Sequence, residues 1–186
     1  MTFGGANGLR RKRNMAATTP ARAANRAANR AADLVPGSVA EHTSCLLLKL
    51  GQVAFRLSEH RLAELGLRVR HYSVLQALLD NGPMSQLDLG AHLRIDAATM
   101  VSTLDTLEQG GYAQRTRDPR DRRRYLVAAT EKGADLGRDA DGLLREVDES
   151  AFADLSATDR KHLHRILGRL AGSPALTEAF DTVRGG

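Results

Sequence analysis

Apolar side chains recur at helical spacing between Glu41 and Gly66. They step by four, three and four residues, which is the pattern of an amphipathic helix. The stripe consists of Leu46, Leu50, Val53 and Leu57. Gly66 is suited to end this helix. A shorter stripe at 72–79 stops before Asn-Gly-Pro at 81–83, so the pattern predicts a long first helix and a short second one.

Short polar residues mark the starts of four further helices. Ser85, Asp96, Thr130 and Ser156 each precede an apolar stripe, where their oxygen can accept a backbone N–H from the first turn. The predicted inward residues are Met100, Leu104 and Leu107 in the second of these helices. The stripe of the third consists of Leu136, Ala140, Leu143 and Val147, and that of the fourth consists of Leu163, Ile166, Leu167 and Leu170.

Two strand-like segments lie between the helices that start after Asp96 and Thr130. They run over 112–116 and 124–129, and a loop containing Asp118 and Pro119 joins them, so we expect a β-hairpin. Three short helices precede this hairpin, one at 72–79, one after Ser85 and one after Asp96. This order predicts a mainly α fold with a winged helix-turn-helix. The third of those helices would enter a DNA major groove.

The outer helices extend this unit on both sides. Their stripes at four- and three-residue steps are coiled-coil-like and suit a partner helix, which predicts a homodimer. We therefore divide the chain into a 37–171 domain, an arm and a C-terminal tail. The divisions are an arm at 1–36, dimerisation helices at about 41–65 and 131–171, a winged-helix region at about 68–130, and a tail at 172–186 without predicted structure.

Charge is concentrated in two places. The net charge is +5, yet residues 1–36 hold seven Lys or Arg against one Asp, and 37–186 hold twenty against twenty-one acids. Residues 115–124 alone contain six arginines and two aspartates. A basic arm and a basic loop on a nearly neutral body favour nucleic-acid binding. The low-complexity arm predicts disorder, with a transit peptide or a later start at Met15 as alternatives.

Other functional classes find little support in the composition. We expect no enzyme, because the sequence holds no nucleophile elbow, phosphate loop or paired-carboxylate motif. The six histidines and Cys45 lack metal-ligand spacing, so we expect no metal and no cofactor. No apolar run reaches the length of a membrane span, and a single cysteine fits a reducing cytoplasm.

The segment "IDAATMVSTLDTLEQGGYAQRTRDPRDRRRYLVAATEKG" resembles the core of the MarR family of bacterial transcription regulators. Its motifs are Leu107-Glu108 leading to Gly110 or Gly111, the stretch from Arg115 to Arg123, and Thr130 to Gly133. The resemblance is specific over about 85–135 and extends over roughly 41–171. It implies a dimeric winged-helix repressor of a pseudo-palindromic operator, released from DNA by a small organic effector or by cysteine oxidation.

Specific side chains are expected to contact double-stranded DNA. In the helix that starts after Asp96, the exposed N-terminal positions carry methyl and hydroxyl groups that can contact base edges or phosphates. The helix that starts after Ser85 can bind phosphate at its N-terminus. In the hairpin, the resemblance implies that Asp121 orients an arginine, while the other arginines can enter a minor groove. The expected contacts are Ser85, Gln86, Ala97, Ala98, Thr99, Ser102, Thr103, Arg117, Arg120, Arg122, Arg123 and Arg124.

Two alternatives to the ligand-responsive repressor remain open. Cys45 lies early in the first helix, where redox-sensing members of the family carry a reactive cysteine. The tyrosine positions that accompany that cysteine hold Glu59 or His60 and Val69 instead, although Tyr72 is present. A buried packing residue is therefore the simpler interpretation of Cys45. The second alternative is a less specific architectural protein that coats DNA with its basic arm.

Overall fold

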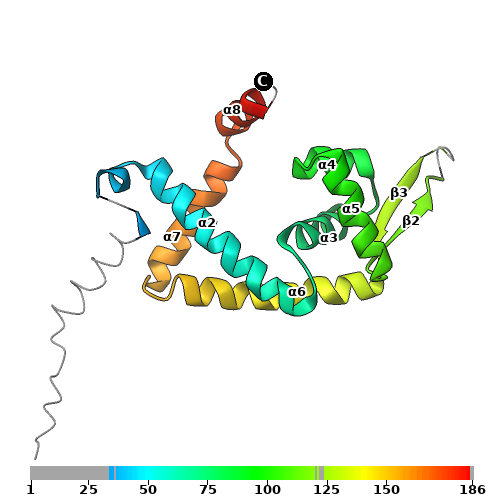
Figure 1. Cartoon of the computed structure of the whole chain (residues 1–186), viewed down its shortest axis with the longest axis horizontal. Coiled ribbons are helices and arrows are strands. Elements are labelled where there is room, and N and C mark those ends of the chain that lie inside the picture. The colour runs from blue at the N-terminus through cyan, green and yellow to red at the C-terminus, as the bar shows by residue number, and fades with distance from the viewer. Residues whose placement is uncertain (1–33, 36, 120, 122–123, 185–186) are drawn as a thin grey trace, which may run out of the picture. The chain divides into compact units, whose positions relative to one another are not determined.

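Helices make up most of the chain in the computed structural model, which describes residues 34–35, 37–119, 121 and 124–184 (Figure 1). The chain divides within its first long helix into two compact units, 1–51 and 52–186. The arm at 1–36 lies almost wholly outside the described residues. The elements are η1 (Gly37–Glu41), α2 (Thr43–Leu62), η2 (Ala63–Leu65), α3 (Val69–Asn81), β1 (Met84–Ser85), α4 (Gln86–Leu93), α5 (Ala97–Gln109), β2 (Ala113–Arg117), β3 (Tyr125–Ala129), α6 (Glu131–Ala151), α7 (Ala157–Ala171) and α8 (Pro174–Arg184).

All four predicted helix caps are confirmed. The side chains of Ser85, Asp96, Thr130 and Ser156 each accept the backbone N–H three residues later, and so satisfy a donor that the helix itself leaves unpaired. Gly66 follows η2 with φ 70°, a left-handed conformation that glycine adopts without a steric penalty. The local signals therefore fix where these helices begin and end.

A three-stranded antiparallel sheet accompanies the helices, with strand order β1-β3-β2. β2 and β3 form the predicted hairpin, with Ala113 opposite Ala129 and Arg117 opposite Tyr125. β1 pairs Met84 with Val127 and was not predicted, because two residues are too few to show an alternating pattern. This added strand ties the start of α4 to the hairpin.

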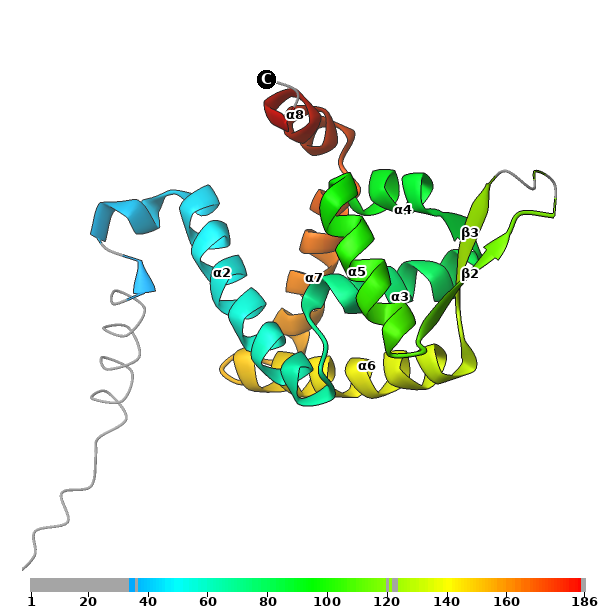
Figure 2. The ribbon, with the colours of Figure 1, turned by 45° about the vertical axis from the view of Figure 1, so that its right-hand side comes forward.

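One aliphatic core holds α3, α4, α5 and the sheet together, and α6 packs against α3 (Figure 2). The predicted inward residues of α5 are confirmed, since Met100, Leu104 and Leu107 are at most 1% exposed. In α6, Leu136 and Ala140 are part of the same core. The expectation that this stripe serves a partner helix is therefore wrong for the first half of α6, which packs within its own chain.

The C-terminal end differs from the expectation of an unstructured tail. Residues Pro174–Arg184 form helix α8. Pro174 occupies the first helical position, where its missing N–H costs nothing, and the backbone N–H of Thr177 donates to Ser173 O at 3.1 Å. The signal was present in the sequence, as a serine followed by proline before an apolar stripe.

Candidate nucleic-acid interface

The outer face of α5 carries small side chains on a rigid support. Ala97, Ala98 and Ser102 are exposed and Thr99 is half-buried. Beneath them the buried side chains of the same helix fix its orientation in the core. The Ser102 hydroxyl donates to Thr99 O at 3.0 Å, and its oxygen can still accept a hydrogen bond. A smooth face of this kind allows close approach of another surface.

Thr103 does not belong to this outer face, and the prediction that it contacts DNA is wrong. Its side chain is fully buried, and its hydroxyl donates to Thr99 O at 2.7 Å. A threonine can turn inward on a helix because the carbonyl four residues earlier satisfies its only donor. Sequence alone did not distinguish this buried hydroxyl from the exposed one of Ser102.

Val101 completes the outer face and was missed by the sequence reasoning. It is 41% exposed, and it lies four residues after Ala97 and three after Ala98, so the three share one helix face. The spacing was the available signal, since the inward set of Met100, Leu104 and Leu107 leaves position 101 pointing away from the core.

At the start of α4 the two predicted residues differ. Ser85 is only 6% exposed, and its hydroxyl donates to Asp88 Oδ2 at 2.6 Å while accepting the Asp88 N–H. Its role is therefore to cap α4, and the expected phosphate contact through this hydroxyl is not supported. Gln86 is half-buried and lines, together with Ala97, a depression of about 500 Å³ between α4 and α5.

The hairpin, or wing, is closed by backbone hydrogen bonds among its described residues. Asp118 N–H donates to Arg124 O at 3.0 Å, and Arg124 N–H donates to Asp121 O at 2.9 Å. The Arg117 guanidinium lies 5.5 Å from the centre of the Tyr125 ring, and Arg124 forms an exposed ion pair with Asp88 at 3.8 Å. The predicted contacts Arg120, Arg122 and Arg123 lie outside the described residues.

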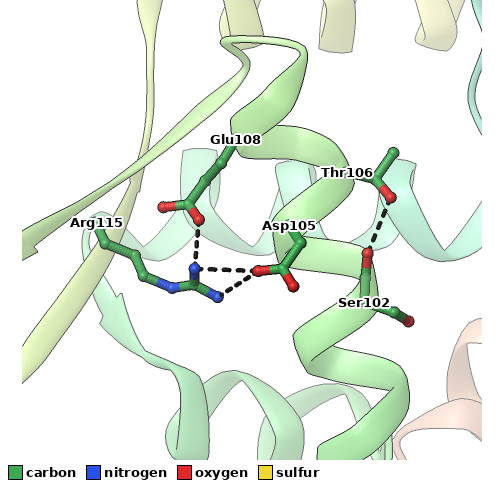
Figure 3. Close-up of polar contacts among 5 residues, drawn as sticks. All are labelled: Ser102, Asp105, Thr106, Glu108 and Arg115. Atoms are coloured by element: carbon green, nitrogen blue, oxygen red, sulfur yellow. Dashed lines mark hydrogen bonds and ion pairs between the residues drawn. The ribbon is translucent and has the colours of Figure 1, made fainter.

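Arg115 has a different role from the rest of the arginine cluster (Figure 3). Its guanidinium donates from β2 to two carboxylates of α5, to Asp105 Oδ1 at 3.2 Å and to Glu108. Asp105 and Glu108 stand three residues apart and therefore share one face of the helix. One arginine between two carboxylates ties the wing to the helix that precedes it, which the run of arginines did not reveal.

Close backbone packing fixes the base of the wing. A Cβ on Gly133 would lie 2.0 Å from Tyr112 O, so only glycine fits there. The Thr130 hydroxyl donates to Gly111 O at 2.7 Å, and Lys132 Nζ donates to Gly110 O at 2.8 Å. The Thr-x-x-Gly and Gly-Gly motifs thus meet at one point, where α6 receives the end of the hairpin.

A half-buried polar pair links α3 to α6. The Tyr72 hydroxyl donates to Asp141 Oδ1 at 2.5 Å. Burial and this hydrogen bond raise the pKa of Tyr72 to about 12, so the phenol stays protonated and remains a donor at neutral pH. At the start of α5, the Thr99 N–H lowers the pKa of Asp96 and so keeps the helix cap ionised.

The remaining candidates show no assembled centre. Cys45 lies half-buried on α2 with a free thiol. Within the described part of the chain, no group of three His, Cys, Asp or Glu side chains could hold a metal ion. Among the same residues, no helix is both long and apolar enough to cross a membrane.

Comparison with known proteins matches residues 67–125 to the model of the MarR family. A protein proposed to regulate the hcr operon of Thauera aromatica is 32% identical over 151 residues, covering 80% of this chain and 90% of that protein. The HTH-type transcriptional repressor NicR of Pseudomonas putida is 29% identical, covering 76% and 89%.

A solved structure gives the same result. The crystal structure of CouR from Rhodococcus jostii RHA1, bound to p-coumaroyl-CoA, superposes with a TM-score of 0.62 at 30% identity and covers 73% of this chain and 95% of that one. The residues at 67–125 that match the family model include the whole of α4 and α5, together with β2. On fold, motif and relatives together, the chain belongs to the MarR family of transcription regulators.

Proposed function

We propose that the chain acts as a homodimeric, ligand-responsive repressor that binds a pseudo-palindromic DNA operator in the cytoplasm. The observation that carries the proposal is the outer face of α5, which is smooth, exposed and rigidly supported next to an arginine-rich wing. A helix of this kind in the major groove and a basic hairpin beside it form the binding arrangement of a winged helix-turn-helix.

In this proposal α5 reads the major groove mainly by shape and methyl contact. Ala97, Ala98 and Val101 present apolar groups that suit the methyl group of thymine, and the hydroxyls of Thr99 and Ser102 suit base acceptors or phosphates. Gln86 at the first position of α4 can donate to a phosphate. Long side chains for bidentate base contacts are absent from this list, so much of the specificity would come from DNA shape.

The wing supplies the charge. Arg117, Arg120, Arg122, Arg123 and Arg124 are the proposed contacts to phosphate and to the minor groove, where the potential is most negative. Asp121 is proposed to orient Arg123, since a carboxylate two residues away can hold a guanidinium bidentately. The fixation of Arg115 by Asp105 and Glu108 supports the proposal, because it holds the wing in one position relative to α5.

A second copy of the chain is the proposed partner of the outer helices. In α2, Leu47, Leu48 and Leu50 are 48–64% exposed; in α7, Ile166, Leu167 and Leu170 are 38–47% exposed. Faces of this kind mark protein–protein contacts. Two copies related by a two-fold axis would present two α5 helices to half-sites one helical turn apart, which requires a pseudo-palindrome.

A small organic effector is proposed to release the DNA. The support is the 30% identical CouR, whose crystal structure holds p-coumaroyl-CoA. In the fold, a ligand that changes how α3 packs on α6 would shift the reading helices, since the Tyr72–Asp141 pair joins the two.

The test is selection of binding sites from random DNA, followed by footprinting. We expect a discrete pseudo-palindrome with half-site centres about 10 base pairs apart. Uniform coverage without a selected sequence would contradict the repressor and favour the architectural alternative.

Arg123→Ala should weaken operator binding by about 1–3 kcal/mol while the dimer stays folded. A gel-shift affinity within twofold of the original protein would overturn the role of Arg123.

The arm at 1–36 adds a salt-dependent contribution in this proposal. If about three of its seven cationic side chains in each copy reach phosphate, deleting the arm should flatten the plot of log K against log salt by roughly 5 for the dimer. Base preference should be unchanged, because α5 and the wing are retained. An unchanged slope would show that the arm does not contact DNA.

A further inference from the structure

The turn between α4 and α5 contains an unusual residue, Arg94. Its φ is 53°, and among the described residues it is the one non-glycine residue with positive φ. Arg94 ends α4, with its N–H directed to the carbonyls of Gly90 and Ala91. A side chain in this left-handed conformation carries a steric penalty that glycine would avoid. The Arg94 side chain is therefore expected to make a contact that a glycine at this position would lack.

That contact is made with the C-terminal helix. Arg94 Nε and Nη2 donate to Asp181 Oδ1 and Oδ2 at 3.1 and 3.2 Å, a bidentate arrangement across 87 residues of chain. The guanidinium also lies 5.6 Å from the centre of the Phe180 ring. Two neighbouring residues of α8 thus hold one cation through charge and through an aromatic face.

The position of Arg94 gives this contact a consequence for DNA binding. It stands two residues before Asp96, the cap of α5, and the turn of a helix-turn-helix lies close to the phosphate backbone when the following helix enters the groove. A cation at this turn suits a phosphate. In the structure the Asp181 carboxylate of α8 holds this cation instead.

We propose that α8 is an autoinhibitory clasp on the helix-turn-helix: Asp181 and Phe180 hold Arg94 in the DNA-free protein, and operator phosphate replaces Asp181 when the protein binds. The proposal rests on the DNA-binding function proposed above. It makes the C-terminal helix a competitor of DNA for one cation in each copy of the chain.

The strength of the clasp suits this role. Arg94 and Asp181 are 38% and 58% exposed, and an exposed ion pair stabilises a protein only slightly. A weak clasp opens readily, so it lowers DNA affinity without abolishing it. We expect its removal to tighten operator binding about threefold per subunit, or about tenfold for a dimer. The salt slope should stay nearly unchanged, because Arg94 contacts phosphate in the complex of either protein.

The experiment compares Asp181→Asn with Glu178→Gln by operator titration at several salt concentrations. Glu178 is the matched control, because it removes the same charge from the same helix while the ion pair to Arg94 belongs to Asp181. We expect Asp181→Asn to bind more tightly and Glu178→Gln to resemble the original protein. Equal tightening by both would show that only the net charge of α8 matters and would overturn the clasp.

A double-mutant cycle with Arg94→Gly tests the partner. Glycine accepts the positive φ, so this variant should fold. It should bind the operator more weakly, and Asp181→Asn should then bring no further gain. Gain in the Arg94→Gly background would overturn the proposal. If the original protein binds no DNA, the proposed function fails; if it binds and Asp181→Asn does not tighten it, only the clasp fails.

Hydrogen exchange gives an independent measure of the clasp. We expect the amides of 174–184 to exchange faster in Asp181→Asn than in the original protein without any DNA, and faster in the original protein once operator is added. Exchange of α8 that is unaffected by both changes would contradict the proposal.

Discussion

The helices α5 and α7 carry apolar stripes of similar spacing, yet they are buried to very different extents. In α5, Met100, Leu104 and Leu107 are at most 1% exposed. In α7 no residue is buried, although Leu163, Ile166, Leu167 and Leu170 follow the same kind of pattern. α5 finds its partners in the same chain, among α3, α4 and the sheet.

The difference shows that periodicity predicts an apolar face and not what covers it. The helix-turn-helix closes its core with its own residues, so it is complete within one chain. α7 leaves three large apolar side chains 38–47% exposed. An exposed apolar face of this kind is typical of a helix that packs against another chain. The following predictions test this contrast, beginning with the largest expected effect.

Gly133→Ala should strongly destabilise the winged-helix core that α3, α4, α5, the sheet and the start of α6 share. The new Cβ would lie 2.0 Å from Tyr112 O, and a backbone carbonyl cannot move aside easily. We expect a loss of about 3–5 kcal/mol in the free energy of unfolding, measured by urea titration. Gly142→Ala, on the same helix with nothing within 4 Å, should stabilise by about 0.5–1 kcal/mol. Equal effects of the two changes would contradict the proposed packing of the wing base.

Leu170→Glu should disrupt the dimer and leave the fold of each chain intact. A charge placed in an apolar interface loses its hydration, so we expect dimerisation to weaken by about 2–4 kcal/mol. Sedimentation over a concentration series measures this. Lys161→Glu, on the opposite face of α7, is the control and should leave the association unchanged. If Leu170→Glu lowered the helical content of the chain, its side chain would belong to an intrachain core.

Arg115→Ala should have a smaller effect on stability than on DNA binding. Its ion pairs with Asp105 and Glu108 are partly exposed, so their loss should cost about 1 kcal/mol of stability. The wing would then lose its fixed position beside α5, and operator affinity should fall about tenfold. Thermal melts and gel shifts give the two values. A variant with unchanged operator affinity would show that the wing is positioned without this cluster.

Acidification should slightly lower the free energy of unfolding of the winged-helix core through His71. This side chain is 5% exposed, and its Nδ1 accepts the Arg68 N–H at 3.1 Å. Burial, then the nearby Arg70 and Arg68, lower its pKa from the usual value. As pH falls below about 6.5, the unfolded chain binds a proton that the folded one resists, so stability decreases. His71→Asn should show a flatter stability profile between pH 7.5 and 5.5; an identical profile would contradict this assignment.

Much of the fold could be predicted from local signals in the sequence. Ser85, Asp96, Thr130 and Ser156 were recognised as caps because their chemistry acts within three residues. The stretch following Arg115 indicated the wing because Pro119 and the charge run occur together. β1 could not be predicted, since its two residues acquire strand character only by pairing with β3.

The side-chain roles that sequence missed depend on contacts between distant elements. Thr103 and Ser102 look alike in the sequence, and only the packing of α5 decides that Thr103 is buried. Arg115 looks like its neighbours, and only the two carboxylates of α5 separate it from them. The link from Arg94 to Asp181 spans 87 residues and leaves no pattern in either segment.

The most direct test of the contrast between α5 and α7 is the stoichiometry of the protein on its selected operator, measured by sedimentation together with footprinting. We predict two chains per operator, a two-fold symmetric footprint over both half-sites, and loss of this footprint in Leu170→Glu while its helical content is retained. A single chain that protects the whole operator, or a Leu170→Glu protein that binds as tightly as the original, would contradict the proposal that α7 depends on a second copy.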